Sequence, residues 1–203
     1  GSGPPGGVLV SAGVPASPQV LCTVTDGKLD ELSGLVAEPG PGGDRLWAMS
    51  DGGRRVQVHR IDPATCDVVE TRTADVDPYD AEDLALGPDG ALWVADTGNR
   101  RVLGWDDGLP QHHGAPAALV LGQPDFAHRD ENAGRAPGPA SMRWPHALSF
   151  PDGGLCVADA GNNRLMLWRQ RPRRAMTPCD LVLGQADTDT VDHNRAIYHP
   201  DAA

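Results

Sequence analysis

The stretch LWVADTGNRR, residues Leu92–Arg101, recurs as LCVADAGNNR at residues Leu155–Arg164. A weaker copy, LWAMSDGGRR, begins at Leu46. A second repeated segment follows the two strong copies, as LVLGQPD from Leu119 and LVLGQAD from Leu181. Self-similarity at such long spacing indicates a supersecondary unit that is repeated along the chain.

Each unit has the pattern of four short strands. In the second unit the expected strands are EDLALG (82–87), ALWVAD (91–96), RRVLGWD (100–106) and, after a loop, AALVLG (117–122). No apolar run keeps a period of 3.6 residues, so helical repeats are disfavoured. Four short antiparallel strands in each repeat of about 40–45 residues are typical of a β-propeller blade.

The predicted fold is therefore all-β, with three to four four-stranded propeller-type blades that do not complete a single ring. Unit one spans about 19–62, unit two about 66–106, unit three about 117–169, and a partial unit starts at about 179. The opening GSG resembles a tag scar, and residues 1–18 are expected to be a flexible N-terminal segment. Outer strands are expected at 19–25, 67–73, 117–122 and 180–184.

Propellers typically close with four to eight blades. Three alternatives remain open: a piece of a longer protein, two chains that complete one ring, or an open stack whose edges are capped. Open edges and bare apolar faces favour association. A protein partner or a second copy of the chain is therefore expected.

The repeats resemble NHL repeats, the blades of six-bladed NHL propellers, through PDGALWVADTGNRRVLGW (88–105) and PDGGLCVADAGNNRLMLW (151–168). The segment from Leu119 to MRWPHALSF (142–150) resembles the long-repeat NHL proteins of bacteria, in which the loop between blades is enlarged. The first hundred residues also resemble esterase-like and phytase-like propellers, through ELSGL, LWAMSDGG and AEDLAL. The NHL resemblance implies an interaction module.

Composition narrows the function further. The formal net charge of -11 disfavours nucleic-acid binding, and no apolar run approaches the roughly 20 residues that span a bilayer. The compartment stays open between cytoplasm and secretion or periplasm. Cysteines stand at 22, 66, 156 and 179 without a CxxC pair, which argues against zinc. Three disulfide pairings are possible, and the favoured interpretation is four small buried apolar residues.

The repeated polar residues are interpreted as turn architecture: Asp51, Asp96, Asn99, Asp159 and Asn162. Each Asp follows an apolar strand and is expected to accept hydrogen bonds from backbone N–H groups two residues on, while Gly and Asn supply the positive φ of the reversal. Arg101 and Arg164 are expected to pair with these carboxylates or to reach the next blade.

A candidate ligand site lies at the channel mouth, where the first strands of the blades meet. Alignment on the Asp-Gly turns places Asp83 and His146 at equivalent positions, with Glu82 and Glu31 nearby. Carboxylates with a histidine suit Ca²⁺ or another divalent metal. Similarity to amidating lyases and lactonases, which are propellers with channel metals, implies metal-assisted lyase or hydrolase chemistry as one alternative.

Three functions follow from these observations. The first is a non-enzymatic scaffold that binds a protein or small ligand through blade loops and the channel face. The second is the metal-assisted enzyme with Glu31, Glu82, Asp83 and His146. The third is a half-propeller that assembles into a larger ring. The chain has no G-x-S-x-G, P-loop or G-x-G-x-x-G motif, so enzymatic activity is the less favoured prediction.

Overall fold

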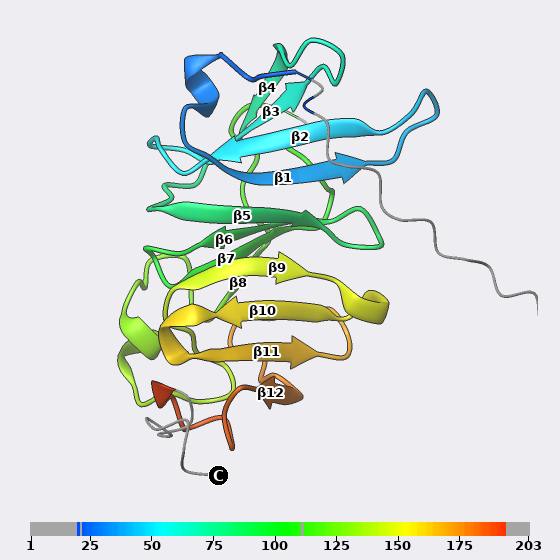
Figure 1. Ribbon diagram of the computed structural model, residues 1–203. Helices are drawn as coiled ribbons and strands as arrows, with labels where there is room; N and C mark the ends of the chain where they lie inside the picture. Colours follow the sequence, from blue (N-terminus) through cyan, green and yellow to red (C-terminus); the bar gives the residue numbers. More distant parts are fainter. Residues whose placement is uncertain (1–19, 21, 111, 194–203) are drawn as a thin grey trace, which may run out of the picture.

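The computed structural model describes residues 20, 22–110 and 112–193. These residues contain three four-stranded antiparallel sheets (Figure 1), and in each the strands follow chain order. Blade one contains β1 (Leu32–Glu38), β2 (Arg45–Ser50), β3 (Gln57–Ile61) and β4 (Val68–Thr73). Blade two contains β5 (Ala81–Leu86), β6 (Leu92–Asp96), β7 (Arg101–Trp105) and β8 (Leu119–Leu121). Blade three contains β9 (Pro145–Ser149), β10 (Leu155–Asp159), β11 (Arg164–Trp168) and β12 (Leu181–Leu183).

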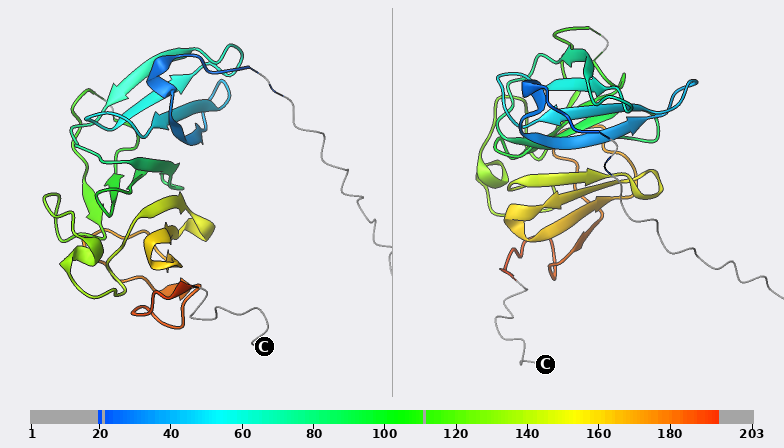
Figure 2. Two further views of the ribbon diagram at one scale, coloured as in Figure 1. Left: turned by 60° about the vertical axis from the view of Figure 1, so that its left-hand side comes forward. Right: turned by 45° about the horizontal axis from the view of Figure 1, so that its top comes forward.

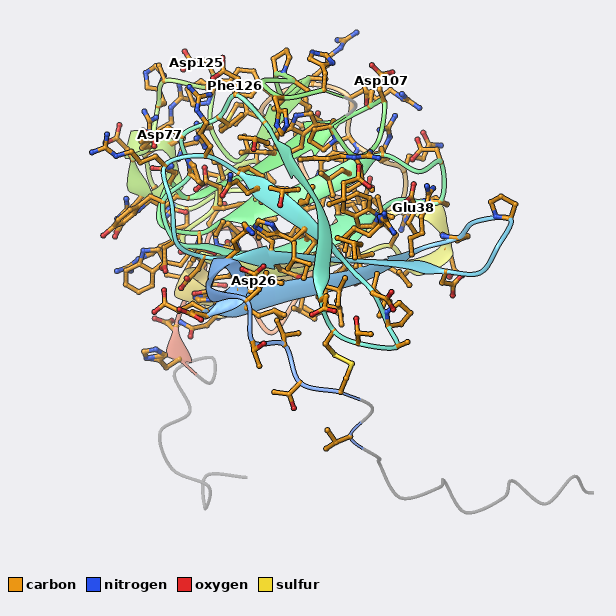
Figure 3. The ribbon with its side chains drawn as sticks, turned by 90° about the horizontal axis from the view of Figure 1, so that it is seen from above. Asp26, Glu38, Asp77, Asp107, Asp125 and Phe126 are labelled. Carbon is orange, nitrogen blue, oxygen red and sulfur yellow. A yellow bond between two sulfur atoms is a disulfide. The ribbon has the colours of Figure 1, made fainter. Side chains whose placement is uncertain are left out.

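The three blades fan out from their first strands. β1 lies against β5, and β5 lies against β9, so the sheets form an arc (Figure 2). This arrangement is an incomplete β-propeller, as the repeats predict. Linkers 74–80 and 122–144 join successive blades, and Figure 3 labels Asp77 and Phe126, one from each linker, on the same side of the molecule.

Two apolar layers hold the blades together. Trp47 of blade one packs between blades one and two, and Trp93, at the same place in blade two, packs between blades two and three. Every residue of β6 and β7 is buried, because blade two is covered on both faces. Burying such aromatic side chains supplies a large share of the apolar stabilisation.

The boundaries of the three sheets differ from the boundaries of the repeat units expected from the sequence. Hydrogen bonding places β4, β8 and β12 after the first three strands of their sheets. In blade one, a reversal at Cys66, with φ of 63°, returns the chain antiparallel to β3. β12 pairs with β11, so the segment from about 179 completes blade three. The further inner strand expected near the end falls beyond residue 193 and outside the described residues.

An N-terminal cap covers the face of blade one that points away from blade two. We define the cap as residues 22–29, which end in the short 3₁₀ helix η1 (Gly27–Leu29). Leu29 packs on Ala48 and Ile61 in a third apolar cluster. The described part of the expected outer strand 19–25 forms no strand, because it packs through side chains such as Val24 instead of joining a ladder.

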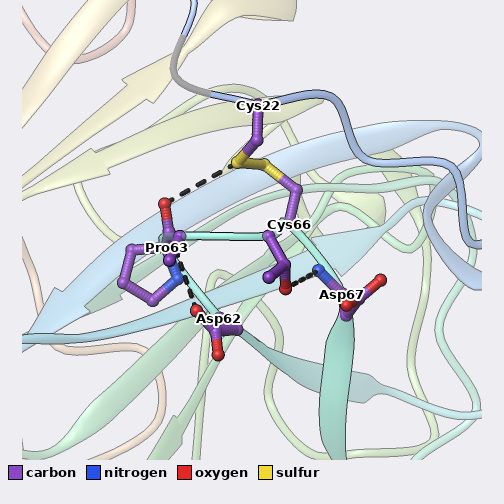
Figure 4. Close-up of a disulfide and its surroundings, with 7 residues drawn as sticks. Cys22, Asp62, Pro63, Cys66 and Asp67 are labelled. Atoms are coloured by element: carbon purple, nitrogen blue, oxygen red, sulfur yellow. Dashed lines mark hydrogen bonds between the residues drawn. A yellow bond between two sulfur atoms is a disulfide. The ribbon is translucent and has the colours of Figure 1, made fainter.

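A disulfide between Cys22 and Cys66 ties the cap to blade one (Figure 4). The two Cα atoms are 5.7 Å apart. For this pair the interpretation as small buried apolar residues was wrong, because sequence alone does not select a pairing. Cys156 and Cys179 are free and half-buried, and burial raises the pKa of both thiols. In the described part of the chain, no helix is long and apolar enough to cross a bilayer.

Candidate functional site

The pairing of the inner strands shows which residues share a level at the channel mouth. Asp83 lies opposite the penultimate residue of β6, and Ala147 lies opposite the penultimate residue of β10. His146 therefore corresponds to Glu82, and the expected equivalence of His146 with Asp83 was wrong. The paired residues Ser149 and Cys156 enclose residues 150–155, one residue fewer than the 86–92 enclosed by the corresponding pair Ala85 and Trp93. This difference shifts an alignment made on the Asp-Gly pair.

Asp83 joins two blades. One carboxylate oxygen accepts from the backbone N–H of Leu84 at 2.9 Å, and the other accepts from Leu148 of β9 at 2.8 Å. Burial raises the pKa of this half-buried carboxyl, and the two backbone hydrogen bonds oppose the rise. Both oxygens thus have structural partners, and Asp83 is a link between blades two and three.

An acidic cluster lies between blades one and two. Carboxylate oxygens of Asp51, Asp80 and Glu82 all lie within 4.8 Å of one another. This is the one group of three or more His, Cys, Asp or Glu residues with that spacing among residues 20, 22–110 and 112–193. Oδ1 of Asp51 is shielded from solvent and has no hydrogen-bond partner. The group thus offers a desolvated oxygen beside two further carboxylates.

Glu31 borders this group. A hydrogen bond with Asp51 and the charge repulsion between the two carboxyls raise the pKa of Glu31. Of the four predicted site residues, the structure thus places Glu82 inside the acidic cluster and Glu31 beside it. His146 lies exposed on blade three, and Asp83 forms the hydrogen bond that links blades two and three.

The side chains at the channel mouth differ between blade two and blade three. Asp80 and Trp144 each precede the first residue of an inner strand and share a left-handed backbone, with φ of 57° and 55°. At this level blade two has Asp80 and Glu82, whereas blade three has the exposed side chains Trp144 and His146. The mouth is therefore acidic at blade two and carries an indole and an imidazole at blade three.

The donor set of the acidic cluster fits a hard cation. Ca²⁺ takes six to eight oxygen ligands and accepts carboxylates together with carbonyls and water. Asp51, Asp80 and Glu82 would hold such an ion, which would supply local charge neutralisation. A mixed nitrogen and oxygen set, which transition metals prefer, is not assembled, because His146 lies outside the group.

Asp96 and Asp159 explain the repeated motif. Asp96 accepts hydrogen bonds from the backbone N–H of Tyr79 at 2.9 Å, Asn99 Nδ2 at 3.1 Å and Arg101 Nε at 2.6 Å. Asp159 accepts the corresponding bonds from its own set of donors at 2.7–2.8 Å: Arg143, Asn162 and Arg164. Burial raises the pKa of both carboxyls, and the guanidinium groups and hydrogen bonds oppose that rise.

These donors differ from the ones expected. The backbone donor comes from the segment that precedes the inner strand, and not from two residues further on. Positive φ occurs at Arg100 and Asn163, each with φ of 55°, and not at the motif glycines. Gly98 is required for another reason, because a Cβ there would collide with the backbone carbonyl of Tyr79.

The motif arginines reach the linkers on both sides of their blade. Arg101 donates to the carbonyl of Asp77 at 3.1 Å in the preceding linker and to Phe126 at 2.7 Å in the following one. Arg164 donates to Ser141 at 3.0 Å in the preceding linker and to Thr188 in the following one. We call the Asp-x-Gly-Asn-x-Arg turn with these contacts the junction turn. It ties blades two and three to the linkers on either side of each.

The motif asparagines complete the junction turn. Asn99 Nδ2 donates to the carbonyl of Asp77 at 3.2 Å, and Asn162 Nδ2 donates to Oδ1 of Asn132 at 2.8 Å. Sequence reasoning interpreted Asn99 and Asn162 as local turn residues and missed these linker contacts. It also missed Asp80, whose i, i+2 spacing from Glu82 was the available signal.

Comparison with known proteins finds partial similarity to solved structures and no family. No family model matches the sequence, and no curated protein matches it. Solved structures with a similar fold include virginiamycin B lyase from Staphylococcus aureus, with 12% identity, TM-score 0.42, and coverage of 70% of this chain and 39% of the other. The nidogen/laminin complex gives 15% identity, TM-score 0.47, and coverage of 71% and 45%. A protein of unknown function from Bacteroides caccae has 10% identity and a TM-score of 0.48, with coverage of 76% of this chain and 46% of the other. The chain thus spans less than half the length of each.

Proposed function

We propose that this chain is an NHL-type propeller scaffold without enzymatic activity, which binds its ligand through blade loops and the channel face. The acidic cluster is the contact point for a cationic group of that ligand or for a divalent cation. The observation that carries the proposal is the close approach of the Asp51, Asp80 and Glu82 carboxylates, together with the shielding of Oδ1 of Asp51 from solvent. Such an arrangement is electrostatically costly unless a positive charge neutralises it.

The arrangement favours a scaffold over the metal-assisted enzyme. Acid–base or metal chemistry needs a second functional group within reach of the reacting atoms. The carboxylate oxygens of Asp83 are bound to backbone N–H groups, and His146 belongs to blade three. The acidic cluster can thus attract a cation, but the predicted catalytic set is not gathered around it.

The Cys22–Cys66 disulfide supports a location in an oxidising compartment. Disulfides persist in oxidising environments and are rare in reducing cytosol. We therefore propose that the protein works in the periplasm or outside the cell, where Ca²⁺ is also available to the acidic cluster.

Calorimetric titration of the whole chain with CaCl₂ tests the cation-binding role. We expect binding that is lost in Glu82→Gln and Asp80→Asn. The matched control is Asp107→Asn, which removes the same charge from an exposed position in the segment after β7. Equal loss in the control would show a general charge effect, and no binding by the parent chain would overturn the proposed role of the cluster.

A further inference from the structure

The face of blade three that points away from blade two exposes leucines. Leu165 is 40% exposed, Leu181 is 49% exposed and Leu183 is 47% exposed. The register of blade two places Val102 and Leu121 at the positions of Leu165 and Leu183, and both are fully buried against blade three. The exposed leucines thus occupy positions that serve a blade-to-blade contact elsewhere in the same molecule.

Side-chain volume on this face is maintained across the strands. In blade two, Trp93 pairs with Gly104, and a Cβ on this glycine would already lie 3.5 Å from the indole. In blade three the corresponding cross-strand pair is Cys156 with Leu167. A small residue has replaced the Trp, and a large apolar residue has replaced the Gly. We call the surface formed by Cys156, Leu165, Leu167, Leu181 and Leu183 the open face.

Blade one differs because it has the features of a terminal blade. Its outer face carries the N-terminal cap. Strand register places Ser50 where blade two has Asp96, and the turn of blade one, residues 51–56, contains no Asn. The junction-turn carboxylate and asparagine are therefore missing from blade one. Terminal units of repeat proteins characteristically carry such modified, covered faces. Blade three has a complete junction turn and no equivalent cap among the described residues.

The segment that leaves blade three repeats the linker that enters it. Gln123 Nε2 donates to the carbonyls of Arg100 at 3.2 Å and Asp130 at 2.8 Å. Gln185 Nε2 donates to the corresponding carbonyls of Asn163 at 3.0 Å and Asp192 at 2.8 Å. Residues 184–193 thus have the conformation that, after blade two, leads the chain to another blade.

The first of these linkers ends in a specific contact with the next blade. Asn132 closes the sequence Asp-Glu-Asn and pairs with Asn162 of the blade-three junction turn at 2.8 Å. The second linker continues in sequence as Asp-His-Asn, with Asn194 at the corresponding place. In sequence, the outgoing linker thus repeats the asparagine that contacts a junction turn at the entry to blade three.

We propose that the open face is a docking surface for a further four-stranded blade that carries an Asp-x-Gly-Asn-x-Arg turn. The partner buries the leucines as blade three buries Val102 and Leu121, and its turn Asn binds the outgoing linker. A second copy of this chain does not fit through blade one, because that blade lacks the turn Asn and Arg and is covered by the N-terminal cap. The surface is independent of the acidic cluster.

The test uses Cys156 as a reporter. The parent is the full chain with Cys179→Ser. The extended chain keeps residues 1–193 of this parent and continues with a copy of residues 132–193 whose cysteines are serines, so that a copied Asn132 takes the place of Asn194. We expect thiol labelling of Cys156 to slow about tenfold or more in the extended chain, since burial protects a thiol. Unchanged labelling in a folded extended chain overturns the proposal.

Two controls keep the outcome unambiguous. An extended chain whose copied turn has lost its linker-binding side chains, Asn162→Ala and Arg164→Gln, should label faster than the first extended chain; equal protection contradicts the role assigned to the junction turn. The parent should remain a monomer with reactive Cys156 over a wide concentration range. Protection that rises with concentration overturns the proposal in favour of a second copy. Protection in the parent monomer shows that the chain's own residues cover the open face, which also overturns it.

Discussion

Nε of Arg101 lies 2.6 Å from Oδ2 of Asp96, and both side chains are buried. The same guanidinium binds carbonyl oxygens in the linkers before and after blade two. The Arg101 side chain therefore connects its own turn to the linkers before and after blade two. The repeated motif in the sequence reflects this set of contacts.

Replacing Arg101 with Met should strongly destabilise the fold. The substitution leaves the buried Asp96 carboxylate without its countercharge, which costs about 3–5 kcal/mol for buried ion pairs. Urea unfolding measures the change in the free energy of unfolding. The control is Arg55→Met, which breaks the exposed pair with Asp75 and should cost about 0–1 kcal/mol. Similar losses for the two variants would contradict the assigned role of Arg101.

Gly98→Ala should reduce stability although Gly98 has no positive φ. The added methyl group meets the ring and the carbonyl oxygen of Tyr79, and such overpacking costs about 1–3 kcal/mol. Gly138→Ala is the matched control, because a Cβ there meets no atom within 4 Å. Thermal unfolding should show a lower midpoint for the first variant and little change for the second. A stable Gly98→Ala protein would mean that the Tyr79 segment moves freely.

Stability should fall as the pH drops below neutrality because of His59. Burial lowers the pKa of His59 below 6.5, with Lys28 lowering it further and Asp26 opposing. The imidazole also contacts the Thr71 hydroxyl, at 2.9 Å. The unfolded chain therefore binds a proton first, and the free energy of unfolding decreases as the pH falls through 6.5, by up to about 1.4 kcal/mol per pH unit.

The loss ends once the pH passes below the folded-state pKa, where both states are protonated. His59→Gln should flatten the pH dependence between pH 7 and 5 in urea unfolding. His113→Gln, at an exposed loop position, is the control and should leave the slope unchanged. A parent protein with equal stability at pH 7 and 5.5 would refute a neutral buried His59.

Removing the Cys22–Cys66 disulfide should destabilise the protein. Its cysteines are 44 positions apart, and the chain-entropy relation gives about 4 kcal/mol for a loop of that size. The variant with Cys22→Ser and Cys66→Ser should unfold at lower urea concentration. Reductant should lower the midpoint of the parent and leave that of the double variant unchanged. If reductant had no effect on the parent, the disulfide would not contribute to stability.

The strands were predictable because the signals are local. The expected strands at 82–87, 91–96, 100–106 and 117–122 correspond to β5, β6, β7 and β8, since alternation, β-branched residues and turn residues mark short strands directly. The incomplete ring was also predictable, because the repeats could be counted. The register between inner strands was not, since a shorter turn before β10 shifts His146 by one position.

The candidate site was only partly predictable for the same reason. Glu31 and Glu82 were named from their places before and within inner strands. Asp51 and Asp80 join them only because blade one packs against blade two, and that contact is between segments far apart in sequence. The disulfide also depends on such a contact, between the cap and the β3–β4 turn.

The capped face of blade one gives the molecule a direction and limits how it can associate. One end of the array is closed by residues 22–29 and a covalent crosslink, while the other end has bare leucines. Each molecule therefore has one adhesive end. Even if two molecules met through these ends, they would form a closed pair to which no further molecule could add. Fibre growth needs two complementary binding surfaces on every subunit. The N-terminal cap, which the Cys22–Cys66 disulfide holds in place, covers one of the two faces.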